Sequence, residues 1–158
     1  MRAVLGLGAN LGNRLTNLRA AVHHLKEIIH IVAKSDVFET EPWGVRDQPR
    51  FLNACVLVEP KGERLFEPEK LLSIVKDIEK RMGRKDSRRW GERVIDIDIL
   101  LMDSLTCESE ILKIPHPHMR ERLFVLTPLS QILPDWKEDA RRLAEKETGR
   151  QPLRICHL

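Results

Sequence analysis

The spacing of apolar residues switches repeatedly between two periods over the first hundred positions, and this switching constrains the fold more than any other feature of the chain. Strand-like runs and stretches of helical spacing follow one another in the order 1–7 (strand), 15–29 (helix), 31–40 and 51–59 (strands), 68–82 (helix) and 94–101 (strand). Asn13 is placed to cap the first helix, Pro68 suits the first turn of the second, and Gly83 stands where a C-terminal cap belongs.

The order β-α-β-β-α-β predicts the α+β class and a ferredoxin-like core, in which an antiparallel sheet packs against two helices on one face. The rest of the chain is predicted to form a C-terminal extension, with a proline-punctuated segment, an apolar stretch over 123–133 and a charged helical end over 135–149. Because 158 residues fit one ordinary domain, we predict a single domain over residues 1–158.

The composition excludes several broad classes of protein. A hydrophobic share of 42% and a charged share of 32% are globular values. Lys and Arg number 27 against 24 Asp and Glu, and the net charge of +3 is too small to require a nucleic-acid partner. The chain has no apolar run near the roughly 20 residues of a membrane span, and its three cysteines form no disulfide or zinc pattern. We therefore expect a soluble, cytoplasmic protein without membrane or nucleic-acid partners.

The sharpest local motif is a pair of carboxylates in the predicted strand 94–101. Side chains alternate between the two faces of a strand, so Asp96 and Asp98 share one face while Ile97 points to the other. Two hard oxygen ligands side by side suit Mg²⁺ that also binds phosphate oxygens. The alternatives are two solvated carboxylates on an open sheet face, or partners for nearby arginines.

A run of basic residues over 80–93 comes directly before this pair. Arginine side chains grip phosphate bidentately, so a basic segment and an acidic pair together predict a clamp for a polyphosphate. Trp90 supports this hypothesis because an indole in a polar loop suggests that the loop closes over a ligand. The alternative is a set of solvated charges that complement the preceding helix dipole.

The remaining motifs divide between binding and structure. Gly8 and Gly12 fit a tight turn from strand to helix, with amides that could approach a ligand, but no P-loop or dinucleotide fingerprint is present. Phe51 and Asn53 share a strand face and could hold a planar heterocycle; a core Phe and a satisfied Asn are the alternative. His116 lacks the companions of a zinc site and would instead donate to phosphate, unless it is an ordinary loop histidine.

Five spaced segments of this chain resemble the 6-hydroxymethyl-7,8-dihydropterin pyrophosphokinase family. They are 8–12 (GANLG), 40–44 (TEPWG), 48–53 (QPRFLN), 89–100 (RWGERVIDIDIL) and 115–124 (PHPHMRERLF). The resemblance implies a single catalytic domain that transfers pyrophosphate from ATP to the hydroxymethyl oxygen of a reduced pterin, with release of AMP, in folate biosynthesis. It also implies two Mg²⁺ ions, small-molecule substrates only and a monomer, although self-association stays open.

The same resemblance assigns roles to individual residues. Asp96 and Asp98 would hold the Mg²⁺ ions, and together with Arg84 and Arg93 they would form the catalytic group. The pterin-binding residues would be Thr40, Trp43, Gly44, Phe51, Asn53 and Phe124, with the two Phe rings on either side of the pterin. The nucleotide-binding residues would be Glu79, Arg84, Trp90, Arg93, Ile99, Lys113, His116 and Arg122.

This chain departs from some relatives near the nucleoside. Ile111 and Lys113 stand where an arginine and a threonine can occur, and Pro117 stands where a tyrosine can occur. Two rival functions remain. An RNA-binding ferredoxin-like module would fit the fold, but the chain lacks the aromatic RNA-binding pattern of such modules. A metal-dependent phosphohydrolase would use the same acidic pair without needing a pterin.

Overall fold

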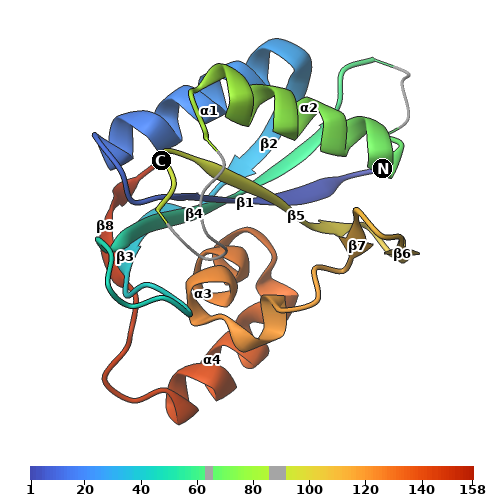
Figure 1. The fold of residues 1–158 in the computed structure, drawn as a ribbon. Coiled ribbons are helices and arrows are strands. Elements are labelled where there is room, and N and C mark those ends of the chain that lie inside the picture. The colour runs from blue at the N-terminus through green and yellow to red at the C-terminus, as the bar shows by residue number, and fades with distance from the viewer. Residues whose placement is uncertain (63–65, 86–91) are drawn as a thin grey trace.

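A six-stranded sheet with helices on both faces forms the centre of the computed structural model, which describes residues 1–62, 66–85 and 92–158 (Figure 1). The elements of the first two thirds are β1 (Ala3–Ala9), α1 (Arg14–Ile28), β2 (Ile29–Lys34), β3 (Asp36–Thr40), β4 (Phe51–Pro60), α2 (Pro68–Arg81) and β5 (Asp96–Met102). The strands lie in the order β5-β1-β4-β3-β8, with β2 also paired to β4, and every pair is antiparallel. The predicted βαββαβ core is confirmed.

One predicted strand is divided in two. The segment 31–40 forms β2 and β3, which both pair with β4 and are separated by Ser35. The backbone N–H of Cys55 donates to Ser35 Oγ at 2.8 Å, while the N–H of Ser35 donates to the carbonyl of Cys55 at 2.9 Å. A side-chain hydroxyl thus replaces a main-chain carbonyl in the ladder, and this substitution marks the break between the strands.

Both predicted helices cover the same face of the sheet, as expected. Asn13 caps α1 by accepting a hydrogen bond of 3.1 Å from the backbone N–H of Thr16. In α2, Pro68 occupies the first turn and the stripe of Leu71, Val75 and Ile78 is fully buried against the sheet. Gly83 follows the helix with φ of 85°, a backbone conformation that glycine adopts without strain.

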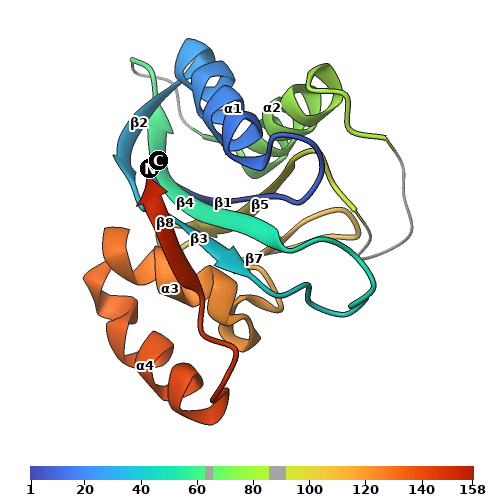
Figure 2. The same ribbon diagram turned by 90° about the vertical axis from the view of Figure 1, so that its left-hand side faces the viewer.

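The C-terminal extension covers the opposite face of the sheet (Figure 2). Its elements are β6 (Cys107–Glu108), β7 (Lys113–Ile114), the short 3₁₀ helix η1 (Met119–Glu121), α3 (Leu123–Ile132), η2 (Pro134–Trp136), α4 (Lys137–Lys146) and β8 (Leu153–His157). Val125, Leu126 and Leu129 of α3 pack on Leu57 and Leu100 of the sheet. The apolar stretch 123–133 is therefore a helix, and the sheet is enclosed between two helical layers.

The last strand is absent from the sequence prediction. β8 pairs with β3 at the edge of the sheet, and its residues Leu153 and Ile155 are largely exposed. Among its five residues Cys156 alone is partly buried, so the alternating pattern of burial that usually marks a strand is missing. The predicted charged helix over 135–149 is confirmed as α4, but it is shorter at both ends.

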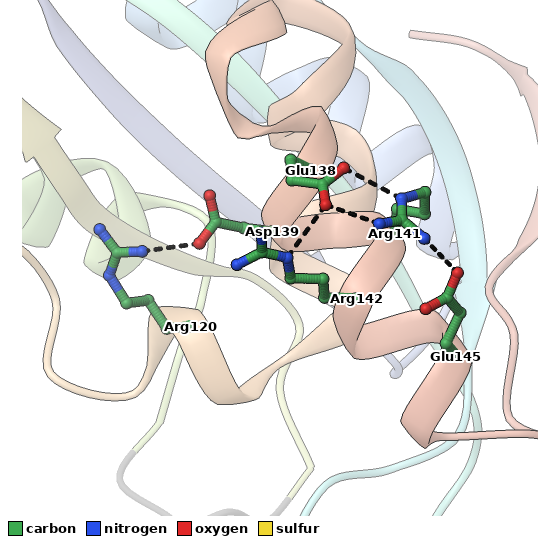
Figure 3. Close-up of polar contacts among 6 residues, drawn as sticks. All are labelled: Arg120, Glu138, Asp139, Arg141, Arg142 and Glu145. Atoms are coloured by element: carbon green, nitrogen blue, oxygen red, sulfur yellow. Dashed lines mark hydrogen bonds and ion pairs between the residues drawn. The ribbon is translucent and has the colours of Figure 1, made fainter.

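An ion pair connects α4 to the segment that precedes α3, and further pairs lie within α4 (Figure 3). Arg120 donates to Asp139 at 2.8 Å, and its guanidinium lies 4.5 Å from the ring centre of Trp136. Glu138 accepts from both Arg141 and Arg142 within the helix. Exposed pairs of this kind each contribute little stability. None of the described helices is long and apolar enough to cross a membrane.

Candidate functional site

The floor of the site is formed by three neighbouring strands. Gly8 of β1 lies opposite Asn53 of β4 on one side and opposite Asp96 of β5 on the other. Two residues earlier, Gly6 lies in the same way between Cys55 and Asp98. The register therefore puts the polar and aromatic residues of β4 and the two carboxylates of β5 on one face, with a single strand between them.

Glycine is required on that middle strand because a side chain would fill the floor. A Cβ atom added to Gly8 would lie 3.0 Å from Asn53 Oδ1 and 3.7 Å from Phe51 Cδ1, and one added to Gly6 would lie 3.2 Å from Leu100 Cδ1. Gly12, with φ of 64°, makes the expected turn into α1. Gly8 itself lies within β1, so its role is close approach rather than the turn.

A cavity of about 310 Å³ opens above this floor. Eleven of the predicted site residues line it: Thr40, Trp43, Phe51, Asn53, Arg84, Arg93, Asp96, Asp98, His116, Arg122 and Phe124. The cavity thus joins an aromatic and amide-bearing end to an end that carries two carboxylates and several basic side chains. Such a combination suits a planar heterocycle beside a polyphosphate.

The two carboxylates differ in environment. Arg84 Nη1 donates to Asp96 Oδ1 at 2.8 Å. Burial raises the pKa of Asp98 to about 7, and the negative charge of Asp96 contributes to the shift. A cation between the two carboxylates would relieve the unfavourable charge of Asp98, so this pair has the character of a divalent-ion site. Within the described ranges, no group of three or more His, Cys, Asp or Glu side chains could hold a metal ion.

Glu79 supports the acidic strand from the side of α2. Its side chain is buried, and Oε1 accepts from the backbone N–H of Ile97 at 2.7 Å and lies 2.6 Å from Nη1 of Arg84. Lys76 Nζ lies 3.0 Å from Oε2. Burial raises the pKa of Glu79, with hydrogen bonding to Ile97 acting in the opposite direction. Glu79 is not among the cavity-lining residues, and its contacts orient Arg84 and fix β5.

His116 is held as a neutral hydrogen-bond donor. Burial lowers its pKa to about 4, and the positive charge of Arg122 adds to that effect. The backbone N–H of His118 donates to Nδ1 of His116 at 3.2 Å. Because Nδ1 accepts, the ring proton resides on Nε2, and that N–H is the group His116 can offer to a ligand.

Aromatic rings surround the buried guanidinium of Arg122. The guanidinium carbon lies 4.5 Å from the ring centre of Trp43 and 5.7 Å from that of Phe124. Burial lowers the pKa of Arg122, although the charge of Asp98 opposes the shift. Arg122 therefore connects the aromatic end of the cavity to its acidic end.

The amide of Asn53 has a defined orientation. Its Nδ2 donates to Thr40 Oγ1 at 2.6 Å, and both side chains are buried. The amide oxygen consequently faces the position of Gly8, at the floor of the cavity. A fixed donor and acceptor arrangement beside Phe51 can read the polar edge of a planar ring.

Some predicted residues lie elsewhere, and the cavity has lining residues that were not predicted. Ile99 packs in the core on the opposite face of β5, Lys113 of β7 pairs with Glu108 at 3.3 Å, and Gly44 is not part of the lining. Trp90 lies outside the described residues. The unpredicted lining residues are Gly6, Leu7, Glu41, Ala54, Cys55, Lys76, Leu100 and Val125. The i, i+3 spacing of Lys76 and Glu79 on the predicted helix was the available signal for Lys76.

Comparisons with known proteins identify the family of this chain. The family model of 7,8-dihydro-6-hydroxymethylpterin-pyrophosphokinase matches residues 4–134. A 2-amino-4-hydroxy-6-hydroxymethyldihydropteridine pyrophosphokinase of Methylorubrum extorquens is 45% identical over 136 residues, which cover 85% of this chain and 84% of that protein. The enzyme of the same name from Bacillus subtilis is 38% identical over 155 residues, covering 97% and 89%.

A solved structure shares the fold. The crystal structure of an HPPK-DHPS in complex with substrates aligns with a TM-score of 0.69 at 17% identity, over 92% of this chain. The aligned part is 44% of that longer chain. The match to the family model and the similarity to the bacterial enzymes extend over most of the chain, and on these grounds the chain belongs to the 7,8-dihydro-6-hydroxymethylpterin-pyrophosphokinase family.

Proposed function

We propose that this chain is a single catalytic domain that transfers pyrophosphate from ATP to the hydroxymethyl group of 6-hydroxymethyl-7,8-dihydropterin in folate biosynthesis. Membership of the pyrophosphokinase family supports the reaction. The observation that carries the proposal is one cavity that contains both Phe51 and Asn53 at one end and Asp96 and Asp98 at the other. Acceptor and donor substrates would therefore meet across the glycine floor of β1.

The reaction breaks one bond and forms one. The hydroxymethyl oxygen attacks the β-phosphorus of ATP, and the bond from that phosphorus to the α,β-bridging oxygen breaks. The bridging oxygen leaves with AMP, while the pterin retains the β- and γ-phosphates and the hydroxyl proton passes to solvent. Phosphoryl-type transfer depends mainly on positioning and charge neutralisation, so the site needs no nucleophilic side chain.

Asp96 and Asp98 would hold Mg²⁺. The pair fits such an ion because both carboxylates line the cavity and because burial makes the charged form of Asp98 unfavourable. When bound, the ions would neutralise phosphate charge and polarise the phosphorus under attack. The family resemblance implies two such ions, and phosphate oxygens of ATP would add to the oxygen ligands that the two carboxylates offer.

The basic side chains of the cavity would bind the phosphates of ATP. Arg84 and Arg93 would neutralise the charge that develops during transfer, Arg122 would contact phosphate, and the Nε2–H of His116 would donate to a phosphate oxygen. Lys76 adds a further cation on the α2 side of the cavity. By family resemblance alone we also assign Lys113 and Trp90 to the nucleotide. The same resemblance places Ile99 beside the adenine, which it would contact with its main chain, because its side chain packs in the core. Glu79 would act through Arg84.

The aromatic end would bind the pterin. Phe51 and Phe124 both line the cavity and would enclose the ring, while Asn53 and Thr40 would read its polar edge. Trp43 and Gly44 would belong to the loop that covers it. We further propose that the protein acts as a cytoplasmic monomer on these small molecules; all three cysteines are free, as a reducing compartment requires.

A product assay tests the proposal directly. The protein is incubated with Mg-ATP, with and without 6-hydroxymethyl-7,8-dihydropterin, and AMP and phosphate are quantified. We expect AMP to appear only with the pterin, in equal amount to the pterin diphosphate. Release of phosphate from ATP without pterin would instead identify a phosphohydrolase. Asp96→Asn should form little AMP in this assay, whereas the control Asp36→Asn, in β3 and outside the cavity lining, should retain the activity.

A further inference from the structure

Asn10 is a buried polar side chain that joins segments on both sides of the cavity. The residue is 2% exposed and directly follows β1. Its Oδ1 accepts a hydrogen bond of 2.7 Å from the backbone N–H of Arg93. Its Nδ2 donates to Gln48 Oε1 and to the carbonyl of Pro49, each at 3.0 Å. Both donor protons and the acceptor oxygen of one amide are thus engaged.

The surrounding backbone fixes the orientation of this amide. A backbone N–H can only donate and a backbone carbonyl can only accept, so Arg93 must face Oδ1 and Pro49 must face Nδ2. The carbonyl of Arg93 also accepts from the N–H groups of Asn10 and Leu11, at 3.0 and 3.2 Å. Asn10 is therefore held by four hydrogen bonds of its own, three of them through its side chain, and replacing that side chain would leave buried groups unsatisfied.

The two segments that Asn10 joins both contribute to the cavity. Residues 41–50, here called the pterin loop, supply Glu41 and Trp43 to its lining, while Arg93 lines it on the side of β5. Within the pterin loop, Gln48 Nε2 donates to the carbonyl of Val45 at 2.6 Å. The bond from Asn10 to Gln48 therefore stabilises the conformation inside the loop, while the bond to Pro49 fixes the end of the loop.

We propose that Asn10 is a positioning residue that sets the spacing between the pterin loop and Arg93. Transfer requires the hydroxymethyl oxygen and the β-phosphorus to approach within about 3–3.5 Å, and a loose spacing would lower the rate even with both substrates bound. The proposal rests on the proposed function, because it assigns the pterin to one side of Asn10 and the phosphates to the other. Asn10 itself acts only through the two segments.

The Asn10 amide has two arms, which two substitutions separate: the bond of Oδ1 to Arg93, and the bonds of Nδ2 to Gln48 and Pro49 in the pterin loop. Asn10→Asp keeps an oxygen for the N–H of Arg93 but sets a second oxygen against the carbonyl of Pro49, so it breaks only the arm to the pterin loop. We expect the KM for pterin to rise about tenfold and the KM for Mg-ATP to change less than about twofold. Asn10→Ala breaks both arms, and we expect kcat to fall as well, by about 100-fold.

Asn13→Ala is the matched control in the same turn. Asn13 caps α1 through the N–H of Thr16 and contributes nothing to the cavity lining, so its loss should lower the melting temperature without changing either KM. Kinetics are compared with thermal melts of all three variants and with calorimetric binding of pterin and of a non-hydrolysable ATP analogue. If Asn10→Ala fails to fold, Asn10→Asp still decides, because it keeps the volume of the side chain.

The outcomes distinguish this inference from the proposed function. A wild-type protein that forms no AMP with pterin contradicts the proposed function itself. Normal wild-type activity, combined with equal rises of both KM values in Asn10→Asp or with the same kinetics in Asn13→Ala, overturns the role of Asn10. A selective rise of the KM for pterin, matched by weaker pterin binding in calorimetry, supports it.

Discussion

Arg84 and Asp96 form a hydrogen bond of 2.8 Å between Nη1 and Oδ1, and the same nitrogen lies 2.6 Å from Oε1 of Glu79. One guanidinium therefore joins the end of α2 to the cavity face of β5. The neighbouring carboxylate, Asp98, is influenced instead by the positive charge of Arg122, which opposes the upward shift of its pKa. The acidic pair is thus arranged with a basic side chain for each carboxylate before any phosphate binds, an example of electrostatic preorganisation.

Removing either carboxylate should abolish most of the activity. Asp96→Asn and Asp98→Asn keep the side-chain volume but lose a metal-binding charge, so we expect kcat to fall at least about 100-fold at saturating Mg²⁺. The fold should survive, as shown by an unchanged circular dichroism spectrum. Turnover close to that of the wild type in either variant would count against the metal assignment.

The environment of Asp98 also predicts a pH-dependent stability. Its pKa in the folded protein is raised to about 7, above the value of about 4 in an unfolded chain, so the folded state binds the additional proton between these pH values. The stability contributed by protonated Asp98 is present at low pH and is lost as the pH rises through 7.

Asp98→Asn imitates the protonated carboxyl and should remove this dependence. We expect its melting temperature in EDTA to exceed that of the wild type by roughly 5 °C at pH 8, with the difference shrinking toward pH 4. Mg²⁺ with an ATP analogue should stabilise the wild type more than the variant. A variant that is less stable than the wild type at pH 8 in EDTA would show that burial does not penalise this charge.

Gly8→Ala tests whether the floor of the cavity must be free of side chains. The added Cβ would lie 3.0 Å from Asn53 Oδ1, so the amide that would read the pterin must move. We expect the KM for pterin to rise about tenfold with a small change in the KM for ATP. Gly62→Ala is the control for a general loss of stability. Its φ of 72° is unfavourable for alanine, but its Cβ would contact nothing within 4 Å and it lies outside the cavity lining, so both KM values should stay unchanged. Equal KM values for pterin in Gly8→Ala and Gly62→Ala would contradict the requirement for a floor without side chains.

The sequence predicted those parts of the fold and site that depend on local pattern. The alternation of apolar spacing is set by burial on one face, so it revealed α1, α2 and the core strands. The strand position of Asp96 and Asp98 was likewise sufficient to place both carboxylates on one face. The break at Ser35 was not predictable, because it depends on a hydroxyl that meets a backbone N–H of another strand.

Contacts between distant segments were the main part that the sequence did not reveal. Gly8 resembles a turn residue locally, and only the register with Asn53 and Asp96 shows that it opens the cavity floor. Asn10 lies in segment 8–12 of the family resemblance, but nothing local reveals its contacts, since its partners lie 38 and 83 residues away along the chain. β8 lacks a fully buried face and is held as a strand by its pairing with β3.

At that edge of the sheet, Asp36 should stabilise the fold against acid. It accepts hydrogen bonds from Arg154 at 2.7 Å, Gln131 at 3.1 Å and His157 at 3.1 Å, and thereby connects β3 to β8 and α3. These bonds, that from Arg154 most of all, lower the pKa of Asp36 to about 2. A depressed carboxyl pKa contributes stability that is present above about pH 4 and is lost as the pH falls through 2.

Asp36→Asn should therefore destabilise the protein at pH 7 but much less at pH 2. Because Arg154 and His157 are largely exposed, solvent screening reduces the expected loss at pH 7 to about 1 kcal/mol. Urea unfolding at a series of pH values measures the difference from the wild type, with Glu108→Gln as a control for an exposed carboxylate whose ion pair lies within the two-stranded sheet of β6 and β7. The ion pairs of Asp36 would then hold β8 to β3 only above acidic pH. A difference in unfolding free energy between variant and wild type that stays constant from pH 7 to pH 2 would show that Asp36 acts through packing alone.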